Sequence, residues 1–227
     1  MKIFFILVEP YHPENVGAAA RAIKTMGFDN LFLVNPRNHL DESAKWMAHG
    51  SIDILEKAKI FSTFESAIND IDFIIGTTSK KRKINYDYYD CNEVLQIINN
   101  KLNSISSIAV VFGREDRGLS NDELKLCNII SSIPIAVKYP SLNLSQTVMI
   151  YAYTLSSLFD KKTADAKKNI SNSETVQLKK KIETILKNLD FKQESNIYNR
   201  IFERLEVIGD SDINLLHSIC NKLCDKF

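Results

Sequence analysis

The sequence has 227 residues, of which 44% are hydrophobic and 25% are charged, both ordinary values for a globular protein. This composition excludes a mainly disordered chain, and the length allows one or at most two domains. The 29 lysine and arginine residues stand against 28 aspartate and glutamate residues, a formal net charge of +1. The near balance excludes a purely electrostatic coat for nucleic acid, although a local basic patch can still occur within it.

The first apolar run, MKIFFILVEP, ends at Glu9-Pro10 and carries no small-residue cleavage pattern. It is too short to span a bilayer, so we expect a buried first strand and no membrane segment. The four cysteines contain no CxxC pair, which favours a reduced, cytoplasmic protein. His217, Cys220 and Cys224 share a predicted helix, where packing of the thiols is favoured over a metal site.

Apolar runs alternate with helical stretches through residue 159, which predicts an α/β domain with a parallel sheet. Ser120-Asn121-Asp122-Glu123 has the form of a capping box and therefore predicts the start of a helix. The expected strands are 3–8, 31–34, 72–76, 107–112 and 129–133, and the expected helices are 15–26, 63–70, 91–102, 120–127 and 147–159.

The composition changes after residue 159. Residues 160–172 are rich in lysine and poor in large apolar side chains, so they are interpreted as a basic linker. From residue 173 the apolar residues return at helical spacing, with polar breaks at Asp190 and Gly209. The domain prediction is therefore an α/β domain over 1–159 and a small appendage of three short helices over 173–227.

Four segments do not resemble ordinary packing. The first, NVGAAAR at 15–21, follows the first strand and predicts a helix start with exposed backbone N–H groups and small side chains. Such a start allows close approach by a bulky or anionic group. The alternative is a tightly packed helix in which Arg21 makes a surface ion pair. The glycine fingerprint G-x-G-x-x-G is absent from the chain, which argues against a dinucleotide-dependent dehydrogenase.

The second segment, GTTSKKRK at 76–83, leaves a predicted strand at its carboxyl end, where open α/β sheets bind ligands. Its cations are followed by tyrosines at 86, 88 and 89. Basic side chains beside aromatic rings favour an RNA surface, and a solvated basic loop is the alternative.

The third segment, VVFGREDRGL at 110–119, places two glycines among four charged residues, which favours binding over a plain loop. The fourth combines the Ile-Pro pair at 133–134 with YPSLNLSQ at 139–146. These residues also suit turns and helix caps, so a structural role is the alternative for each. Together, the loops at the strand ends predict one pocket large enough for adenosine.

The motifs N-x-G-A-x-x-R at 15–21, FGRE-x-x-GL at 112–119 and IP…SLNLS at 133–145 resemble those of the SPOUT superfamily, TrmH-type RNA ribose 2′-O-methyltransferases. The C-terminal residues are similar to the extension of the TrmJ subfamily, which methylates the pyrimidine at tRNA position 32. The resemblance implies a deep trefoil knot in the C-terminal part of the α/β domain, helices on both faces of the sheet, S-adenosylmethionine as the cofactor, tRNA as a partner and a homodimer.

The resemblance also implies roles for individual residues. It places Arg21 at the catalytic centre, where the family's arginine is often proposed as the general base. Because a guanidinium stays protonated, clamping the phosphate beside the target ribose is the easier role for Arg21. Asn15 would orient Arg21 or the ribose, and Glu115 and Asn143 would hold the site together. Cofactor contacts are implied at Thr77, Thr78, Ser79, Gly113, Ile133, Pro140, Ser141 and Leu142. RNA contacts are expected at Arg21, Lys80, Lys81, Arg82, Lys83 and Arg114.

Two other functions remain open at this stage. The same chemistry could act on another tRNA position or on ribosomal RNA. The chain could also be a catalytically silent RNA-binding protein, although the intact set of Asn15, Arg21, Glu115 and Asn143 argues against it.

Overall fold

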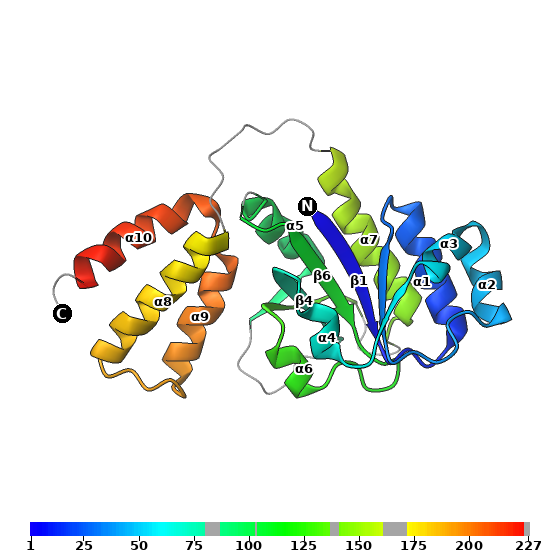
Figure 1. The fold of residues 1–227 in the computed structure, drawn as a ribbon, viewed down its shortest axis with the longest axis horizontal. Coiled ribbons are helices and arrows are strands. Elements are labelled where there is room, and N and C mark those ends of the chain that lie inside the picture. Colours follow the sequence, from blue (N-terminus) through cyan, green and yellow to red (C-terminus); the bar gives the residue numbers. More distant parts are fainter. Residues whose placement is uncertain (80–86, 103, 137–140, 161–171, 225–227) are drawn as a thin grey trace.

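A parallel sheet of seven strands forms the centre of the α/β domain in the computed structural model (Figure 1). The structure describes residues 1–79, 87–102, 104–136, 141–160 and 172–224. The strand order is β3-β2-β1-β6-β4-β7-β5, and every described pairing is parallel. The strands are β1 (Lys2–Val8), β2 (Asn30–Val34), β3 (Lys59–Phe61), β4 (Phe73–Thr77), β5 (Tyr88–Asp90), β6 (Ser107–Phe112) and β7 (Ile129–Ser132).

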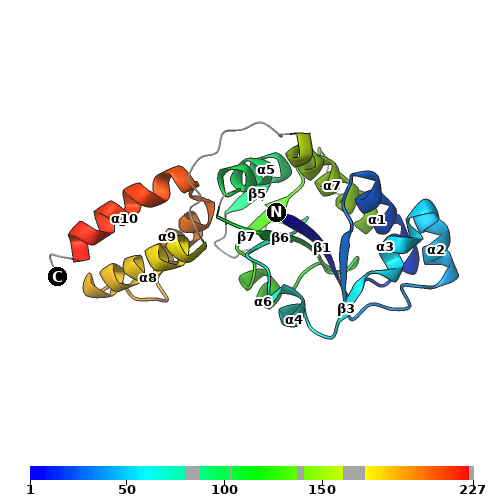
Figure 2. The ribbon, with the colours of Figure 1, turned by 45° about the horizontal axis from the view of Figure 1, so that its top comes forward.

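Helices cover both faces of the sheet, as Figure 2 shows. One face packs against α1, α3, α5 and α7, and the other against α4 and α6, while α2 packs against α1. In the α/β domain the helices are α1 (Pro13–Thr25), α2 (Glu42–Ala48), α3 (Ile52–Glu56), α4 (Phe64–Ile68), α5 (Cys91–Asn100), α6 (Asn121–Lys125) and α7 (Leu144–Asp160), with a 3-10 turn, η1, at His49–Ser51.

The two cores follow from the alternation of side chains along each strand. In β1, Phe5 and Leu7 belong to the cluster under α1 and α7, whereas Ile6 and Val8 belong to the cluster under α4 and α6. A strand buried on both faces needs an uninterrupted apolar run, which is what the sequence provides. The predicted α/β fold with helices on both faces is therefore confirmed. The predicted knot remains a prediction.

The sequence prediction missed β3, β5, α2 and α3. Both strands are only three residues long and lie at the edges of the sheet, where few side chains are buried. In α2, Trp46 is 82% exposed, so the helix lacks a regular apolar stripe. Its start depends instead on Asp41, whose carboxylate accepts a hydrogen bond from the Ser43 amide at 2.9 Å.

The predicted appendage consists of α8 (Asn172–Asn188), α9 (Asn196–Val207) and α10 (Asp210–Cys224), so three helices are confirmed. They share a small apolar core formed by Leu178, Ile185, Leu205, Ile213 and Cys220. The Cys220 thiol is part of this core. Among the described residues, no group of three or more histidine, cysteine or acidic side chains is placed to hold a metal ion.

Polar contacts join α9 to the α/β domain beside β5. The Asp87 carboxylate pairs with Arg200 at 2.6 Å and with Arg204 at 2.9 Å. The backbone N–H of Asp87 donates to Glu203, and Asn128 donates to Glu206 at 3.2 Å.

Within the described ranges, no helix is both long enough and apolar enough to cross a membrane.

The small residues of α1 serve packing between helices. A Cβ built on Gly17 would overlap the backbone carbonyl of Ala44 in α2, so only glycine permits this approach. Ala19 and Ala20 are buried in the core against the sheet. These residues therefore fit the alternative interpretation, a tightly packed helix, better than a helix start that is open to a ligand.

We expect Gly17→Ala to lower the free energy of unfolding by about 1–3 kcal/mol, because the added methyl group forces α1 and α2 apart. Urea denaturation followed by circular dichroism measures this change. Gly50→Ala is the matched control, since nothing lies within 4 Å of its added Cβ. Equal stabilities of the two variants would contradict the packing argument.

Candidate functional site

A cavity of about 760 Å³ lies at the carboxyl edge of the sheet, among the loops that follow β1, β4, β6 and β7. Its volume falls in the range of small-molecule sites, and its position is the one that open α/β sheets use for ligands. The structure brings together seven of the predicted cofactor residues in its lining, namely Thr77, Thr78, Ser79, Gly113, Ile133, Ser141 and Leu142. Pro140 lies outside the described residues.

Several lining residues were not predicted: His12, Phe112, Asp116, Arg117, Gly118, Ile135, Leu144, Thr147 and Tyr151. Leu144, Thr147 and Tyr151 are spaced i, i+3, i+7 on α7, a helical period that could have indicated one inward face. Tyr151 is buried and donates a hydrogen bond to the Ser131 hydroxyl at 2.6 Å. Burial raises the pKa of Tyr151, so it remains a neutral donor.

The Glu115 carboxylate joins two loops at the rim of the cavity. It accepts hydrogen bonds from the backbone N–H groups of Tyr11 at 3.0 Å and His12 at 3.2 Å. The Asn15 amide donates to the same carboxylate at 3.1 Å. Asn143 then donates to the Asn15 side-chain oxygen at 2.9 Å. Three of the four predicted catalytic residues therefore form one chain of hydrogen bonds.

This hydrogen bonding keeps Glu115 ionised. Partial burial alone would raise the pKa of Glu115, but the donors Tyr11, Asn15 and His12 outweigh it and leave the pKa below its usual range. An ionised carboxylate only accepts hydrogen bonds, so Glu115 serves as an anchor for these three donors and not as a proton donor near neutral pH.

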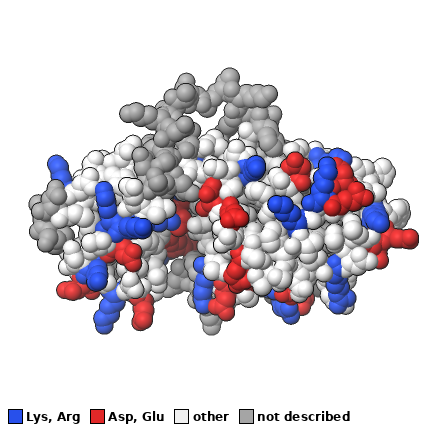
Figure 3. All heavy atoms as spheres, viewed as in Figure 1, with Lys and Arg blue, Asp and Glu red and all other residues white. Residues whose placement is uncertain are grey.

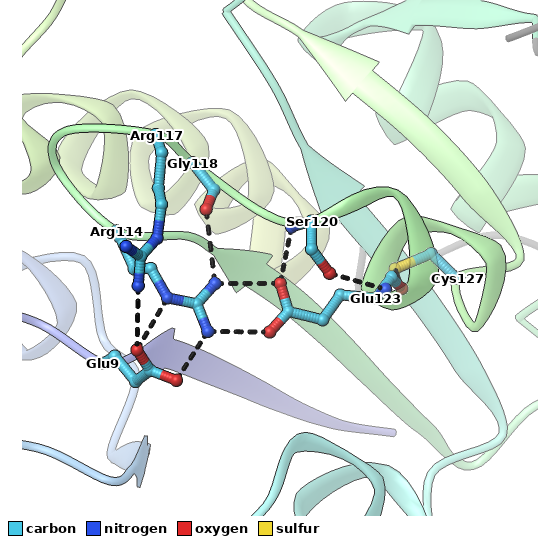
Figure 4. A network of polar contacts seen from close by, with 7 residues as sticks. All are labelled: Glu9, Arg114, Arg117, Gly118, Ser120, Glu123 and Cys127. Carbon is cyan, nitrogen blue, oxygen red and sulfur yellow. Dashed lines mark hydrogen bonds and ion pairs between the residues drawn. The ribbon is translucent and has the colours of Figure 1, made fainter.

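Arg114 is held from both sides by carboxylates, as Figure 4 shows. Its guanidinium donates to Glu9 at 2.6 and 2.7 Å and to Glu123 at 3.0 Å through two nitrogens. Glu123 also accepts from the Ser120 N–H in the predicted capping box, which is confirmed. The Arg114 side chain is only 12% exposed.

These ion pairs shift the pKa values of all three groups. Hydrogen bonds from Arg114 lower the pKa of Glu9, and the same contacts overcome burial to lower the pKa of Glu123. Glu9 and Glu123 raise the pKa of Arg114. The recorded contacts of Arg114 hold the 113–118 loop against β1 and α6, and its contact with RNA remains a prediction.

The loop needs glycine at its first position. A Cβ on Gly113 would overlap the backbone of Gly118 and Leu119. The Gly118 N–H donates to the Arg114 carbonyl at 2.9 Å, and Gly118 adopts φ 70°, a left-handed conformation. The two glycines of the third segment therefore allow the chain to fold back on itself beside the cavity.

The structure does not bring Arg21 into the cavity. Arg21 is exposed on α1 and is absent from the described lining, and no described carboxylate pairs with it. The expected surface ion pair of Arg21 is therefore not seen. Lys80, Lys81, Arg82 and Lys83 lie outside the described residues.

Two family models match the chain. Residues 2–153 match the SpoU rRNA Methylase family. Residues 173–227 match the C-terminal domain of the tRNA/rRNA methyltransferase LasT. The two matches correspond to the α/β domain and to the helical appendage.

Two curated relatives illustrate the sequence similarity. The chain is 36% identical to the uncharacterized tRNA/rRNA methyltransferase LasT of Escherichia coli (strain K12) over 223 residues, which cover 98% of this chain and 97% of that protein. It is also 36% identical to the tRNA (cytidine/uridine/adenosine-2′-O-)-methyltransferase TrmJ of Pseudomonas aeruginosa (strain UCBPP-PA14) over 152 residues. That alignment covers 67% of this chain and 59% of TrmJ.

Solved structures share the fold. A probable methylase family protein from Haemophilus influenzae Rd KW20 has a TM-score of 0.74 and 29% identity, covering 99% of this chain and 96% of that one. The SpoU methyltransferase AviRb from Streptomyces viridochromogenes, solved in complex with AdoMet, has a TM-score of 0.58. It is 18% identical and covers 70% of this chain and 61% of its own, so the likeness concerns the fold alone.

Glu115→Gln should lower the free energy of unfolding by about 1–2 kcal/mol near pH 7, because an amide replaces an ionised acceptor of three hydrogen bonds. The folded-state pKa of Glu115 lies below the usual 4.5. The contribution is therefore complete above pH 4.5 and is lost as the pH falls through the folded pKa. Urea titrations of both proteins between pH 7 and pH 3 measure the difference.

Glu56→Gln, an exposed position at the end of α3, is the control and should change stability by less than about 0.5 kcal/mol. A Glu115→Gln difference that stayed constant down to pH 3 would show that the Glu115 charge is not what stabilises the loops.

Proposed function

Because the chain belongs to the SpoU rRNA methylase family, we propose that it is an S-adenosylmethionine-dependent RNA ribose 2′-O-methyltransferase. The proposed substrate is tRNA, and the proposed target is the pyrimidine at position 32 of the anticodon loop. The observation that carries the proposal is the cavity at the carboxyl edge of the sheet, directly bordered by the Glu115–Asn15–Asn143 chain. A small-molecule pocket and a fixed polar rim thus lie together at the carboxyl ends of the strands.

The residues present fit S-adenosylmethionine. Phe112, Ile133 and Leu142 offer apolar surface for an adenine ring, while Thr78 and Ser79 offer hydroxyl groups. Gly113 lines the same cavity. When bound, this cofactor supplies an electrophilic methyl group for transfer to a ribose 2′-hydroxyl.

The protein contributes orientation to this reaction. The Glu115 hydrogen bonds fix the turn before α1, and Asn143 ties the start of α7 to the same turn. The Arg21 guanidinium stays protonated in proteins, so it is a poor general base. We assign it to the phosphate beside the target ribose, where it orients the 2′-hydroxyl while the proton leaves to phosphate or water.

A homodimer would explain why Arg21 does not reach the cavity of its own chain. Arg21 lies on α1, which packs beside α7, and Tyr153 on α7 is 69% exposed. An exposed aromatic side chain on the neighbouring helix suits an interface between two copies. In the proposed dimer, Arg21 of one protomer reaches the cavity of its partner.

A cytoplasmic location is proposed with this function.

The target nucleotide has a second candidate. The similarity to LasT of E. coli extends over the appendage, and residues 173–227 match the LasT C-terminal domain. The name of that relative includes both tRNA and rRNA, so the same chemistry on another tRNA position or on rRNA is the second proposal. A catalytically silent RNA-binding protein is disfavoured by the connected Glu115, Asn15 and Asn143.

The deciding experiment is a methyl-transfer assay with purified protein, labelled S-adenosylmethionine and unmodified tRNA or rRNA, with the product mapped by nuclease digestion and mass spectrometry. A ribose methyl at tRNA position 32 supports the leading proposal. A ribose methyl elsewhere supports the second one. Binding of RNA without transfer would overturn the enzymatic proposal.

Arg21→Ala should lower kcat at least a hundredfold and leave the affinity for S-adenosylmethionine within a few-fold, because the side chain lies outside the cavity. Calorimetry measures binding, and the labelled assay measures kcat. Loss of cofactor binding in this variant would contradict the assigned role.

A complementation experiment tests the dimer. Ile133→Trp, at a position that lines the cavity, should fill part of it while leaving Arg21 intact. Mixed with Arg21→Ala, it should restore part of the activity, since each active cavity then receives an arginine from the other protomer. If both variants are folded and the mixture stays inactive, Arg21 does not act across the dimer.

A further inference from the structure

Two neighbouring strands end in the same way. Residues 7–11 read LVEPY at the end of β1, and residues 33–37 read LVNPR at the end of β2. The strands pair in register through Val8 and Val34, so the two segments occupy equivalent places along the sheet edge. Glu9 and Asn35, the residues just after the strands, have φ values of 46° and 43°.

Both turns are strained and held in place. A non-glycine residue in the left-handed region costs about 1–3 kcal/mol and persists only where its surroundings fix it. The N–H of Glu9 donates to the Val34 carbonyl at 2.8 Å, and the N–H of Asn35 donates to the Phe61 carbonyl at 2.8 Å. These bonds continue the ladder of the sheet by one residue beyond the strands.

The result of the paired turns is a stacked side-chain pair. The Arg37 guanidinium carbon lies 3.5 Å from the centroid of the Tyr11 ring. Tyr11 is 52% exposed, and Arg37 is also exposed. At this distance the ring holds the plane of the guanidinium by cation–π attraction, so an exposed arginine has a defined orientation.

The stacked pair is connected to the candidate site. The backbone N–H of Tyr11 donates to Glu115, and the next residue, His12, lines the cavity. The backbone of Tyr11 is therefore part of the polar rim of the cavity. This places Tyr11 and Arg37 beside the cavity opening, on the side where β1 ends.

The charge of Arg37 is not compensated. Arg114 is neutralised by Glu9 and Glu123, and Lys24 by Asp53, whereas no described carboxylate forms an ion pair with Arg37. In the face that Figure 3 shows, the coloured basic and acidic side chains are interspersed. An oriented, unpaired guanidinium suits a phosphate, which it can bind through two parallel hydrogen bonds.

We propose that the Tyr11–Arg37 stack binds a backbone phosphate of the RNA next to the nucleotide that enters the site. This proposal rests on the proposed function, because it takes RNA as the substrate. Tyr11 acts by positioning the guanidinium, and Arg37 makes the contact.

The test is tRNA binding by the full-length protein over a range of salt concentrations, combined with calorimetry of S-adenosylmethionine binding. Arg37→Ala should weaken tRNA binding about tenfold at low salt and reduce the slope of log K against log salt by about 0.7–0.9, the share of one phosphate. Tyr11→Phe should bind like the wild type, and Tyr11→Leu should bind as weakly as Arg37→Ala. Cofactor affinity should not change in any of them.

Lys2→Ala is the matched control. It removes one positive charge from the exposed start of β1, at the opposite edge of the sheet, and should leave affinity and slope unchanged. An Arg37→Ala protein with wild-type affinity and slope would overturn the proposal. So would loss of cofactor binding, which indicates a structural role, or a changed oligomeric state, which indicates a protein contact.

Failure of the proposed function gives a different result. If the wild type binds tRNA but transfers no methyl group, the enzymatic proposal fails while the Arg37 measurements still decide the phosphate contact. If the wild type methylates tRNA and Arg37→Ala does so with the same KM for tRNA, only the stack proposal fails.

Discussion

The attachment of the 113–118 loop to the segment after β1 is the constraint on which the site depends. Two consecutive residues of opposite charge make it. Arg114 binds the Glu9 carboxylate, and Glu115 accepts from the backbone N–H groups of Tyr11 and His12. The loop is thus fixed at three positions of one short segment, Glu9, Tyr11 and His12. Pro10, which lies between them, has no N–H to donate.

Everything at the rim of the cavity follows from this attachment. The start of α1 is fixed because Asn15 binds Glu115, and the start of α7 is fixed because Asn143 binds Asn15. Charge-assisted hydrogen bonds are stronger than neutral ones, so an ionised Glu115 is a suitable centre for such a chain. The polar rim and the cavity therefore keep their relative position.

The sequence predicted the parts of the fold that depend on burial. Continuous apolar runs identified the five inner strands, because a strand covered on both faces consists mainly of apolar residues. The edge strands β3 and β5 were missed, since three exposed or half-exposed residues leave no apolar pattern. The loop residues of the cavity could be predicted because they combine glycine, hydroxyl groups and charge at strand ends.

The residue that each side chain contacts was harder to predict than the loop or helix in which the side chain lies. Nothing in the sequence indicates that Arg114 pairs with both Glu9 and Glu123, or that Gly17 faces a carbonyl of α2, because such pairs depend on the packing of distant segments. Arg21 shows the same limit, since its place in the motif did not reveal that it lies outside the described lining of its own cavity.

The two outermost strands of the sheet, β3 and β5, affect how the protein can associate with other chains. An exposed edge strand offers unpaired backbone groups to other chains and favours aggregation. Here β3 and β5 are each three residues long, and the segment before β5 is bound by Arg200 and Arg204 of α9. Edge-to-edge addition of another sheet is therefore disfavoured at both ends. A second copy of the chain would associate more readily through helix surfaces than by extending the sheet.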